Sequence, residues 1–346
     1  MSKVKVGIIN VSGYAGVELA RLLSQHPEVE LTSVTGRSTA GKKLGDVFPH
    51  LASTNLTIEA ELGEVDIAFS AMPHQKSAKE VIPLVSSGIR VVDISADFRL
   101  KNATEYEHWY GFSHPAPQLL KEAVYGLTEL YRSQVASAQL VANPGCYPTG
   151  AILALAPAVK AGITGPEIII DSKSGVSGAG RTLSLQTHFA EANEDVTAYA
   201  LDGHRHLPEI IQELKLLHPE PPPLITFVPH LVPMTRGILT TGYASIASGK
   251  IPVDKKGRVE LFQLYLEFYR DEPFVKVVGF PPHTKQTWGN NACLIHPTID
   301  TRTGRLIVIS SLDNLVKGAA GQAIQNMNLM LGLPETTSLE APAIYP

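Results

Sequence analysis

Apolar and polar positions follow two different patterns along the chain. In the first part, short apolar runs alternate with segments of helical period, as expected for strands buried on both faces. We expect strands at residues 4–10, 29–35, 65–70, 90–94 and 139–143, and helices at 14–25 and 77–85. Strands that alternate with helices form a parallel sheet with right-handed crossovers. Residues 1–147 therefore predict a doubly wound α/β domain of the kind that binds nucleotides.

The second part has longer strand-like segments and fewer helices between them. The strand-like segments are 167–172, 224–228, 237–246, 291–299 and 305–310, and the helical ones are 207–217 and 254–270. A turn at 301–304 joins the last two strands and indicates a hairpin. Residues 148–312 thus predict an α+β domain on a mainly antiparallel sheet, followed by a helix at about 313–331.

Composition and charge exclude several classes of partner. The chain has 346 residues, 44% of them apolar, and a net charge of −4, so we expect binding neither to nucleic acid nor to an anionic membrane. No run of about 18 apolar residues predicts a membrane span. The only cysteines are Cys146 and Cys293, and their spacing predicts neither a disulfide framework nor a zinc site. A reducing cytoplasm is the expected location.

The turn after the first strand has the glycines of a dinucleotide site. Such a turn needs glycine for tight bending, for approach of the pyrophosphate, and for helix–strand packing. Gly13 and Gly16 match, whereas Asn10 replaces the first glycine. Asparagine tolerates a positive φ better than most residues, so we expect the turn to form.

The end of the second strand predicts which dinucleotide is bound. An acidic residue usually binds a free ribose at this position, but this chain has Arg37 and Ser38, with Lys42 and Lys43 nearby. A cation and a hydroxyl suit a 2′-phosphate, so we expect NADP(H). An ordinary solvated basic loop is the alternative.

The segment Asn-Pro-Gly-Cys-Tyr-Pro-Thr at 143–149 predicts a nucleophile. A strand ends there, and Cys146 precedes a helical stretch with Pro148 near its start. The helix N-terminus would lower the thiol pKa, and Gly145 leaves room for a carbonyl. The alternative is a small buried hydrophobic residue, as most isolated cysteines are.

The segment His-Arg-His-Leu-Pro-Glu at 204–209 can supply a proton. His204 and His206 precede a helix whose positive end favours a neutral imidazole. Glu209 stands in the first turn, where it could orient one of them. A metal site or a solvated loop are the alternatives, although no third ligand is evident.

Two further segments can bind anions. The Gly/Ser-rich loop 174–181 offers backbone N–H groups and Arg181, which suit a phosphate or the nicotinamide half of a dinucleotide. Asp97 and Arg99 either help to bind an anionic substrate or form a structural ion pair.

Together these segments resemble the N-acetyl-gamma-glutamyl-phosphate reductases, over nearly the whole chain. The matching motifs are SGYAG at 12–16, MPH at 72–74, DISADFRL at 93–100, YGLTEL at 125–130, NPGCYPT at 143–149, SGVSGAGR at 174–181, HRHLPE at 204–209, RGIL at 236–239 and LDNLVKGAAGQAIQNMN at 312–328. NPGCYPT and HRHLPE are the most specific. The departure is Asn10, where the family usually has glycine.

The resemblance implies a fold and a set of roles. The fold is that of the aspartate-semialdehyde and glyceraldehyde-phosphate dehydrogenases: a Rossmann NADP domain at 1–147, completed by 313–346, and a catalytic and oligomerisation domain at 148–312. It makes Cys146 the nucleophile and His204 the acid/base, supported by His206 and Glu209. The implied cofactor contacts are Ser12, Gly13, Tyr14, Ala15, Gly16, Arg37, Ser38, Pro73, Ser177, Gly178 and Asn314, the substrate contacts are Arg99 and Arg181, and no metal is expected.

The implied activity is phosphorylating aldehyde dehydrogenase chemistry in arginine biosynthesis. NADPH reduces N-acetyl-glutamyl 5-phosphate to the semialdehyde and phosphate through a thioester on Cys146, in a homo-oligomer of two or four chains. The alternatives are the equivalent reductase of lysine biosynthesis, aspartate-semialdehyde dehydrogenase, and a nucleotide-binding sensor without catalysis.

Overall fold

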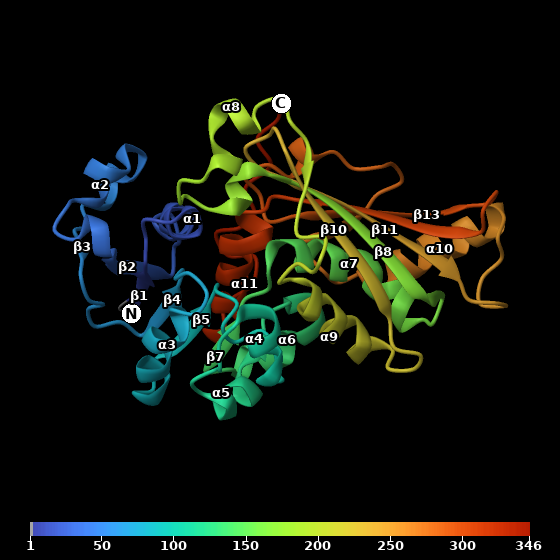
Figure 1. Cartoon of the computed structure of the whole chain (residues 1–346). Helices are drawn as coiled ribbons and strands as arrows, with labels where there is room; N and C mark the ends of the chain where they lie inside the picture. Colours follow the sequence, from blue (N-terminus) through green and yellow to red (C-terminus); the bar gives the residue numbers. More distant parts are fainter. Residues whose placement is uncertain (1–2) are drawn as a thin grey trace. The chain divides into compact units, whose positions relative to one another are not determined.

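The chain forms two compact units. The computed structural model describes residues 3–346. One unit comprises Met1–Gly145 and Ala319–Ala341, and the other comprises Cys146–Gly318 and Pro342–Pro346. Each unit contains one seven-stranded sheet (Figure 1).

The first unit is built on a fully parallel sheet, as predicted. Its strand order is β3-β2-β1-β4-β5-β7-β6, and every neighbouring pair is parallel. The strands are β1 (Val4–Ile9), β2 (Val29–Thr35), β3 (Ile58–Glu59), β4 (Ile67–Ser70), β5 (Arg90–Asp93), β6 (Val124–Tyr125) and β7 (Leu140–Ala142). The carboxyl ends of these strands meet at one edge, where ligands of such sheets bind.

The helices of the first unit come from both of its chain segments. They are α1 (Tyr14–Leu23), α2 (Leu44–Val47), α3 (Ser77–Ser86), α4 (Thr104–Tyr110), α5 (Pro117–Glu122), α6 (Thr128–Ser137) and α11 (Gly321–Met330), with 3-10 turns η1 (Arg37–Thr39) and η2 (Pro49–Thr54). The last of these, α11, packs against α1 and α6. Its buried Asn326 donates a hydrogen bond to the carbonyl of Gly126 (2.9 Å) and accepts one from Thr128 (2.9 Å).

The second unit is built on a mixed, mostly antiparallel sheet, also as predicted. Its order is β12-β13-β14-β11-β8-β10-β9, and only β8/β10 and β12/β13 are parallel. The strands are β8 (Thr164–Gly175), β9 (Thr197–Ala198), β10 (Leu224–Val232), β11 (Ile238–Ile246), β12 (Val275–Val277), β13 (Cys293–Asp300) and β14 (Arg305–Leu312). The predicted hairpin is β13/β14, with Gly304 at a positive φ in its turn.

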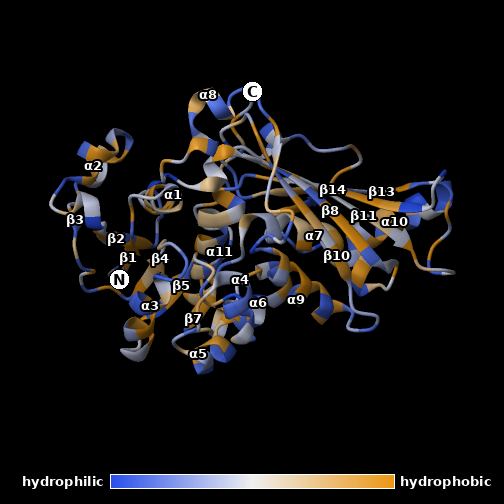
Figure 2. Ribbon diagram, in the orientation of Figure 1, coloured by the Kyte–Doolittle hydropathy of each residue, from blue (hydrophilic) through white to orange (hydrophobic). Residues whose placement is uncertain are grey.

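One helix forms the centre of the second core. The helices are α7 (Cys146–Lys160), α8 (Phe189–Ala192), α9 (Leu207–Leu217) and α10 (Lys255–Phe268), with short turns η3 (Val176–Ala179), η4 (Leu185–Thr187) and η5 (Thr284–Thr287). The turn η6 (Val316–Ala320) begins in this unit, and its last two residues belong to the first unit. Almost every residue of α7 is buried, and it packs against β11, β14, α9 and α10. Figure 2 shows hydrophobic residues along α7 and the neighbouring strands. A helix buried so fully has little freedom to move its first residue, Cys146.

Among residues 3–346, no helix is both long enough and apolar enough to cross a membrane.

Candidate active site

The turn between β1 and α1 has the predicted conformation. Asn10 adopts a φ of 66°, and its side-chain amide donates to the carbonyl of Ala71 (2.9 Å). A Cβ on Gly16 would lie 2.5 Å from the carbonyl oxygen of Asn10, so the close packing of helix and strand excludes any side chain there. A Cβ on Gly13 would meet nothing closer than 3.7 Å. The fold itself therefore does not require a glycine at position 13.

A cavity of about 400 Å³ lies beside this turn in the first unit. Its lining includes four residues predicted from the sequence and one that was not: Ser12, Arg37, Ser38, Pro73 and Lys76. The side chain of Arg37 is 77% exposed and lies 3.4 Å from a carboxylate oxygen of Glu80. Lys76 was not predicted to line this cavity, although its position two residues after the MPH motif could have indicated it.

The segment that contains Pro73 is fixed by a buried carboxylate. Asp97 is fully buried and accepts hydrogen bonds from the backbone N–H groups of Gln75 (2.7 Å) and Ala78 (2.9 Å). Arg99 is also buried, and it donates to the carbonyls of Asn143 (2.8 Å) and Ile94 (2.7 Å). These hydrogen bonds show that both side chains stabilise the backbone of the first unit. The sequence alone allowed either this structural role or binding of an anionic substrate.

The thiol of Cys146 lies at the first position of the fifteen-residue helix α7 and is partly exposed. The unsatisfied N–H groups of a helix N-terminus stabilise negative charge. Gly318 packs against it, because a Cβ there would lie 2.8 Å from the Cβ of Cys146. By contrast, Cys293 is fully buried in β13.

Tyr147, the neighbour of Cys146, brings the predicted histidines to the same region. Its ring contacts those of His204 and His206, with centroids 5.7 and 5.9 Å away. Its hydroxyl donates to the carbonyl of His230 (3.2 Å) and accepts a hydrogen bond from the hydroxyl of Tyr199 (3.1 Å). Burial, together with the electrostatic effect of the Cys146 sulfur, raises the pKa of Tyr199 to about 12. Thiol, phenols and imidazoles therefore form one cluster within the second unit.

The environment of His204 keeps its imidazole neutral. Its ring contacts Tyr147, Tyr199, His206 and Phe227, with centroids 4.8–5.7 Å apart. Burial, together with the charge of Arg205, lowers the pKa of His204 to about 4. Its Nδ1 accepts the N–H of His206 (3.1 Å). In the neutral ring the proton is therefore on Nε2, where the group can donate it.

The other predicted residues of α9 and of the Gly/Ser-rich loop differ in how far they are buried. Glu209 is fully buried in the first turn of α9. Arg181 is exposed. The loop offers fewer backbone N–H groups than predicted, because those of Gly175, Val176 and Ser177 donate to carbonyls between β10 and β11 (2.9–3.2 Å).

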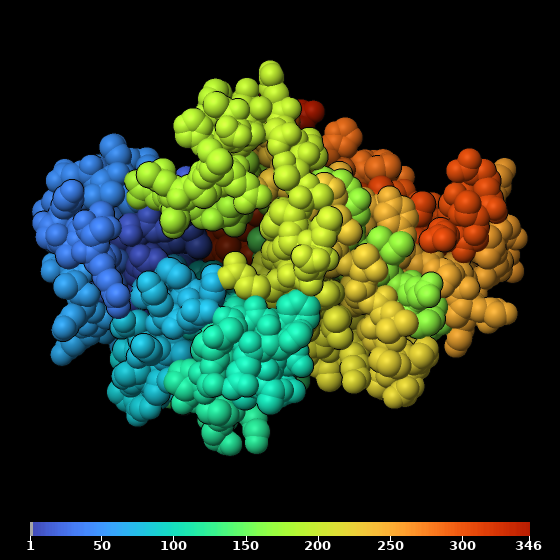
Figure 3. Space-filling view, in the orientation of Figure 1, coloured from blue at the N-terminus to red at the C-terminus, as the bar shows by residue number. Residues whose placement is uncertain are grey.

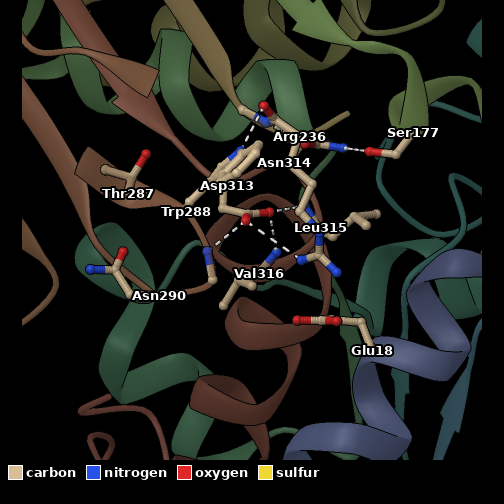
Figure 4. A network of polar contacts seen from close by, with 12 residues as sticks. Glu18, Ser177, Arg236, Thr287, Trp288, Asn290, Asp313, Asn314, Leu315 and Val316 are labelled. Atoms are coloured by element: carbon tan, nitrogen blue, oxygen red, sulfur yellow. Dashed lines mark hydrogen bonds and ion pairs between the residues drawn. The ribbon is translucent and has the colours of Figure 1, made fainter. Parts of the chain in front are cut away.

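Asn314 joins this loop to Gly237, the residue before β11. Its Oδ1 accepts the N–H of Gly237 (2.8 Å), and its Nδ2 donates to Ser177 (2.9 Å) (Figure 4). A Cβ on Gly178 would lie 2.9 Å from the hydroxyl of Ser174, so this loop is tightly packed. Within residues 3–346 no group of three or more His, Cys, Asp or Glu side chains is arranged to hold a metal ion.

Comparisons with known proteins match both units. The family model of the semialdehyde dehydrogenase NAD binding domain matches residues 5–138, and that of the semialdehyde dehydrogenase dimerisation domain matches residues 146–314. The fold is similar to aspartate semialdehyde dehydrogenase II of Vibrio cholerae, with a TM-score of 0.71 over 96% of this chain and 99% of that one, at 16% identity. It is also similar to the enzyme of Candida albicans solved with NADP, with a TM-score of 0.67 over 95% and 99%, also at 16% identity.

Curated relatives are much closer in sequence. The chain is 59% identical, over all of both chains, to an N-acetyl-gamma-glutamyl-phosphate reductase of Dehalococcoides mccartyi. It is 51% identical to one of Pelotomaculum thermopropionicum, over 99% of each chain. Identity at this level, over full length, determines the family and not only the fold.

Proposed function

Because this chain belongs to the N-acetyl-gamma-glutamyl-phosphate reductases, oxidoreductases of arginine biosynthesis, we propose that it reduces N-acetyl-glutamyl 5-phosphate to the semialdehyde, with Cys146 as nucleophile. The observation that carries this proposal is the partly exposed thiol at the start of the buried helix α7, in one cluster with His204. The equivalent reductase of lysine biosynthesis is the alternative.

The residues of the first unit fit NADPH. No side chain caps the N-terminus of α1, which suits it to bind a pyrophosphate, and Arg37 and Ser38 line the adjoining cavity with a cation and a hydroxyl. Both suit a 2′-phosphate. Bound NADPH supplies the hydride that reduces the acyl group.

The protein groups divide the reduction into two easier steps. The Cys146 thiolate attacks the carbonyl of the acyl phosphate, the C–O bond to phosphate breaks, and a thioester remains. After hydride arrives at that carbonyl, the tetrahedral oxyanion needs a proton or a hydrogen-bond donor. The Nε2–H of neutral His204 donates a hydrogen bond to this oxyanion, a contribution of about 10²–10³-fold. The oxyanion then re-forms the C=O bond as the C–S bond breaks, which releases the aldehyde and the Cys146 thiolate.

A homo-oligomer in a reducing cytoplasm is part of the same proposal. The model that matches residues 146–314 is described as a dimerisation domain. The segment 181–203 lies on the surface (Figure 3) and exposes large apolar side chains, namely Leu183, Leu185, Phe189, Val196 and Leu201. Exposed apolar groups of this kind are typical of contact surfaces. Sedimentation equilibrium gives the number of chains, and a monomer at micromolar concentration contradicts the proposal.

The nucleophile is tested with acyl phosphate in the absence of NADPH. The wild type should release up to one phosphate per site and gain the acyl mass on the Cys146 peptide, whereas Cys146→Ser should fold, bind NADPH and do neither. Cys293→Ala is the matched control, because it removes the buried thiol of β13. A fully active Cys146→Ser enzyme would refute the mechanism.

The substrate is tested in the reverse direction. The purified enzyme is supplied with NADP, phosphate and one of three semialdehydes: N-acetyl-glutamate, its one-carbon-longer analogue, or aspartate. The first should have the highest kcat/KM. A preference for the longer analogue would favour the reductase of lysine biosynthesis, and absence of turnover with all three would favour a nucleotide sensor.

A further inference from the structure

The chain does not continue directly from β14 into an α-helix. Asp313 and Asn314 follow the strand, and Val316–Ala320 forms a π turn before α11 begins at Gly321. Such wider turns are rare and occur frequently at functional sites. The first N–H groups of such a turn have no backbone acceptor within it, so they need partners elsewhere.

Asp313 provides those partners. One carboxylate oxygen accepts the N–H groups of Leu315 (2.8 Å) and Val316 (3.2 Å). Its backbone carbonyl accepts the N–H of Gly318 (2.9 Å). Figure 4 shows the carboxylate at the centre of this network. A single residue therefore holds three backbone N–H groups, one just before the turn and two within it.

Neighbouring segments of the second unit fix Asp313 in turn. Its side chain is fully buried. The second carboxylate oxygen accepts the N–H of Gly289 (2.8 Å) and lies 3.5 Å from the guanidinium of Arg236. The ring nitrogen of Trp288 donates to the carbonyl of Arg236 (2.9 Å), which joins these two segments to each other (Figure 4).

The middle of the turn packs against the residue that bears the thiol. A Cβ on Gly318 would lie 2.8 Å from the Cβ and 3.2 Å from the Cα of Cys146. Real side chains do not approach so closely, and the φ of Gly318 is outside the positive range. Contact with Cys146, and not backbone freedom, is thus the reason for a glycine at this position.

We propose that Asp313 is a positioning residue for Cys146 and acts through the π turn and Gly318. The turn supports one side of Cys146 and keeps the thiol at the N-terminus of α7. Displacement of about 1 Å from a reactive geometry can reduce the rate about a hundredfold. This inference rests on the proposed nucleophilic role of Cys146.

The test uses two variants of the full-length enzyme and a matched control. Gly318→Ala adds a methyl group against Cys146, and Asp313→Ala removes the two carboxylate oxygens that accept three backbone N–H groups. Gly279→Ala is the control, because a Cβ at this exposed glycine meets nothing within 4 Å. Each protein is measured for melting temperature, NADPH affinity, kcat, KM, and the pH dependence of Cys146 alkylation by iodoacetamide.

We expect Gly318→Ala to fold and bind NADPH like the wild type, with kcat lower by about a hundredfold and KM little changed. The pH at which Cys146 alkylates at half its maximal rate should rise, because the thiolate moves away from the helix N-terminus. Asp313→Ala should change in the same direction, with partial recovery in Asp313→Asn, which keeps one oxygen acceptor. Gly279→Ala should match the wild type.

A Gly318→Ala enzyme with wild-type kcat and alkylation profile would overturn the inference, even if the Asp313 variants fail to fold. A lower melting temperature with unchanged kcat and alkylation profile would also overturn it. Failure of the proposed function gives a different result: Cys146→Ser would then be active, while the alkylation profile would still report on the turn.

Discussion

At the scale of one side chain, the position of Arg37 predicts a preference for NADPH over NADH. Its guanidinium borders the cavity beside the β1–α1 turn and is mostly exposed, so it can reach a ligand without breaking a buried contact. Arg37→Ala should weaken NADPH about ten- to hundredfold, because a hydrogen bond between charged groups contributes about 1.5–3 kcal/mol. NADH, which lacks the phosphate, should be little affected. Fluorescence titration measures both, Lys42→Ala is the control, and equal losses would contradict the role.

The lowered pKa of His204 leads to a second prediction, on how the stability of the protein depends on pH. In the folded protein it is about 4, against 6.5 in the unfolded chain. Between these values the unfolded chain binds more protons, so acidification from pH 6.5 to 4 favours unfolding. The wild type should therefore lose more stability than His204→Asn over this range, as urea denaturation can measure.

The buried carboxyl of Asp93 titrates in the same pH range, but its effect on stability cancels when the wild type is compared with His204→Asn. Burial and the charge of Asp97 raise the pKa of Asp93 to about 6. Its protonation in the folded state favours folding as the pH falls, which is the opposite sign. Asp93 is present in both proteins, so the difference between them reports on His204. Equal acid sensitivity would mean that His204 is not held neutral.

At the scale of elements, the β1–α1 turn contains two glycines with different expected roles. Gly16 is needed for packing within the fold, and Gly13 is expected to leave room for a ligand. Gly16→Ala would place a methyl group 2.5 Å from the carbonyl of Asn10 and should cost about 1–3 kcal/mol of stability. Gly13→Ala has room in the fold, so its melting temperature should be close to that of the wild type. Its NADPH affinity should fall if the pyrophosphate approaches this backbone. Wild-type affinity in Gly13→Ala would contradict that contact.

Long apolar runs were sufficient to predict five strands of each sheet, because burial alone determines such patterns. The strands β3, β6, β9 and β12 were missed, because two or three residues are too few to show a period. The helices α4, α5 and α6 were missed, since each has ten residues or fewer and a weak apolar stripe. The predicted helix at 313–331 was wrong in its first part, where Asp313 and the π turn precede α11. An apolar period does not distinguish a π turn from an α-helix, because the difference lies in backbone partners that come from distant segments.

The sequence predicted the chemical type of the candidate residues but not their three-dimensional surroundings. The motif at 143–149 and the histidines at 204–209 indicated their chemistry from neighbouring residues. The aromatic enclosure of His204 was not predictable, because Tyr199 and Phe227 come from other elements. The burial of Arg99 was likewise hidden, since an arginine in a loop is usually exposed. The role of Asp313 required the distances to Gly289 and Val316.

At the scale of the whole molecule, the first unit needs a segment that follows Gly318 in the chain. Ala319–Ala341 belongs to it, and α11 supplies buried polar groups, among them Asn326, to partners near Gly126 and Thr128. A chain that ends at Gly318 would leave those partners unsatisfied, at about 1–3 kcal/mol each, and expose the apolar surface under α11. We expect it to lose cooperative unfolding and NADPH binding, as calorimetry and fluorescence titration can measure. A chain that ends at Ala341 is the control, because it removes only Pro342–Pro346, which belongs to the second unit. NADPH binding by the shorter chain with wild-type affinity would show that the first unit folds without α11.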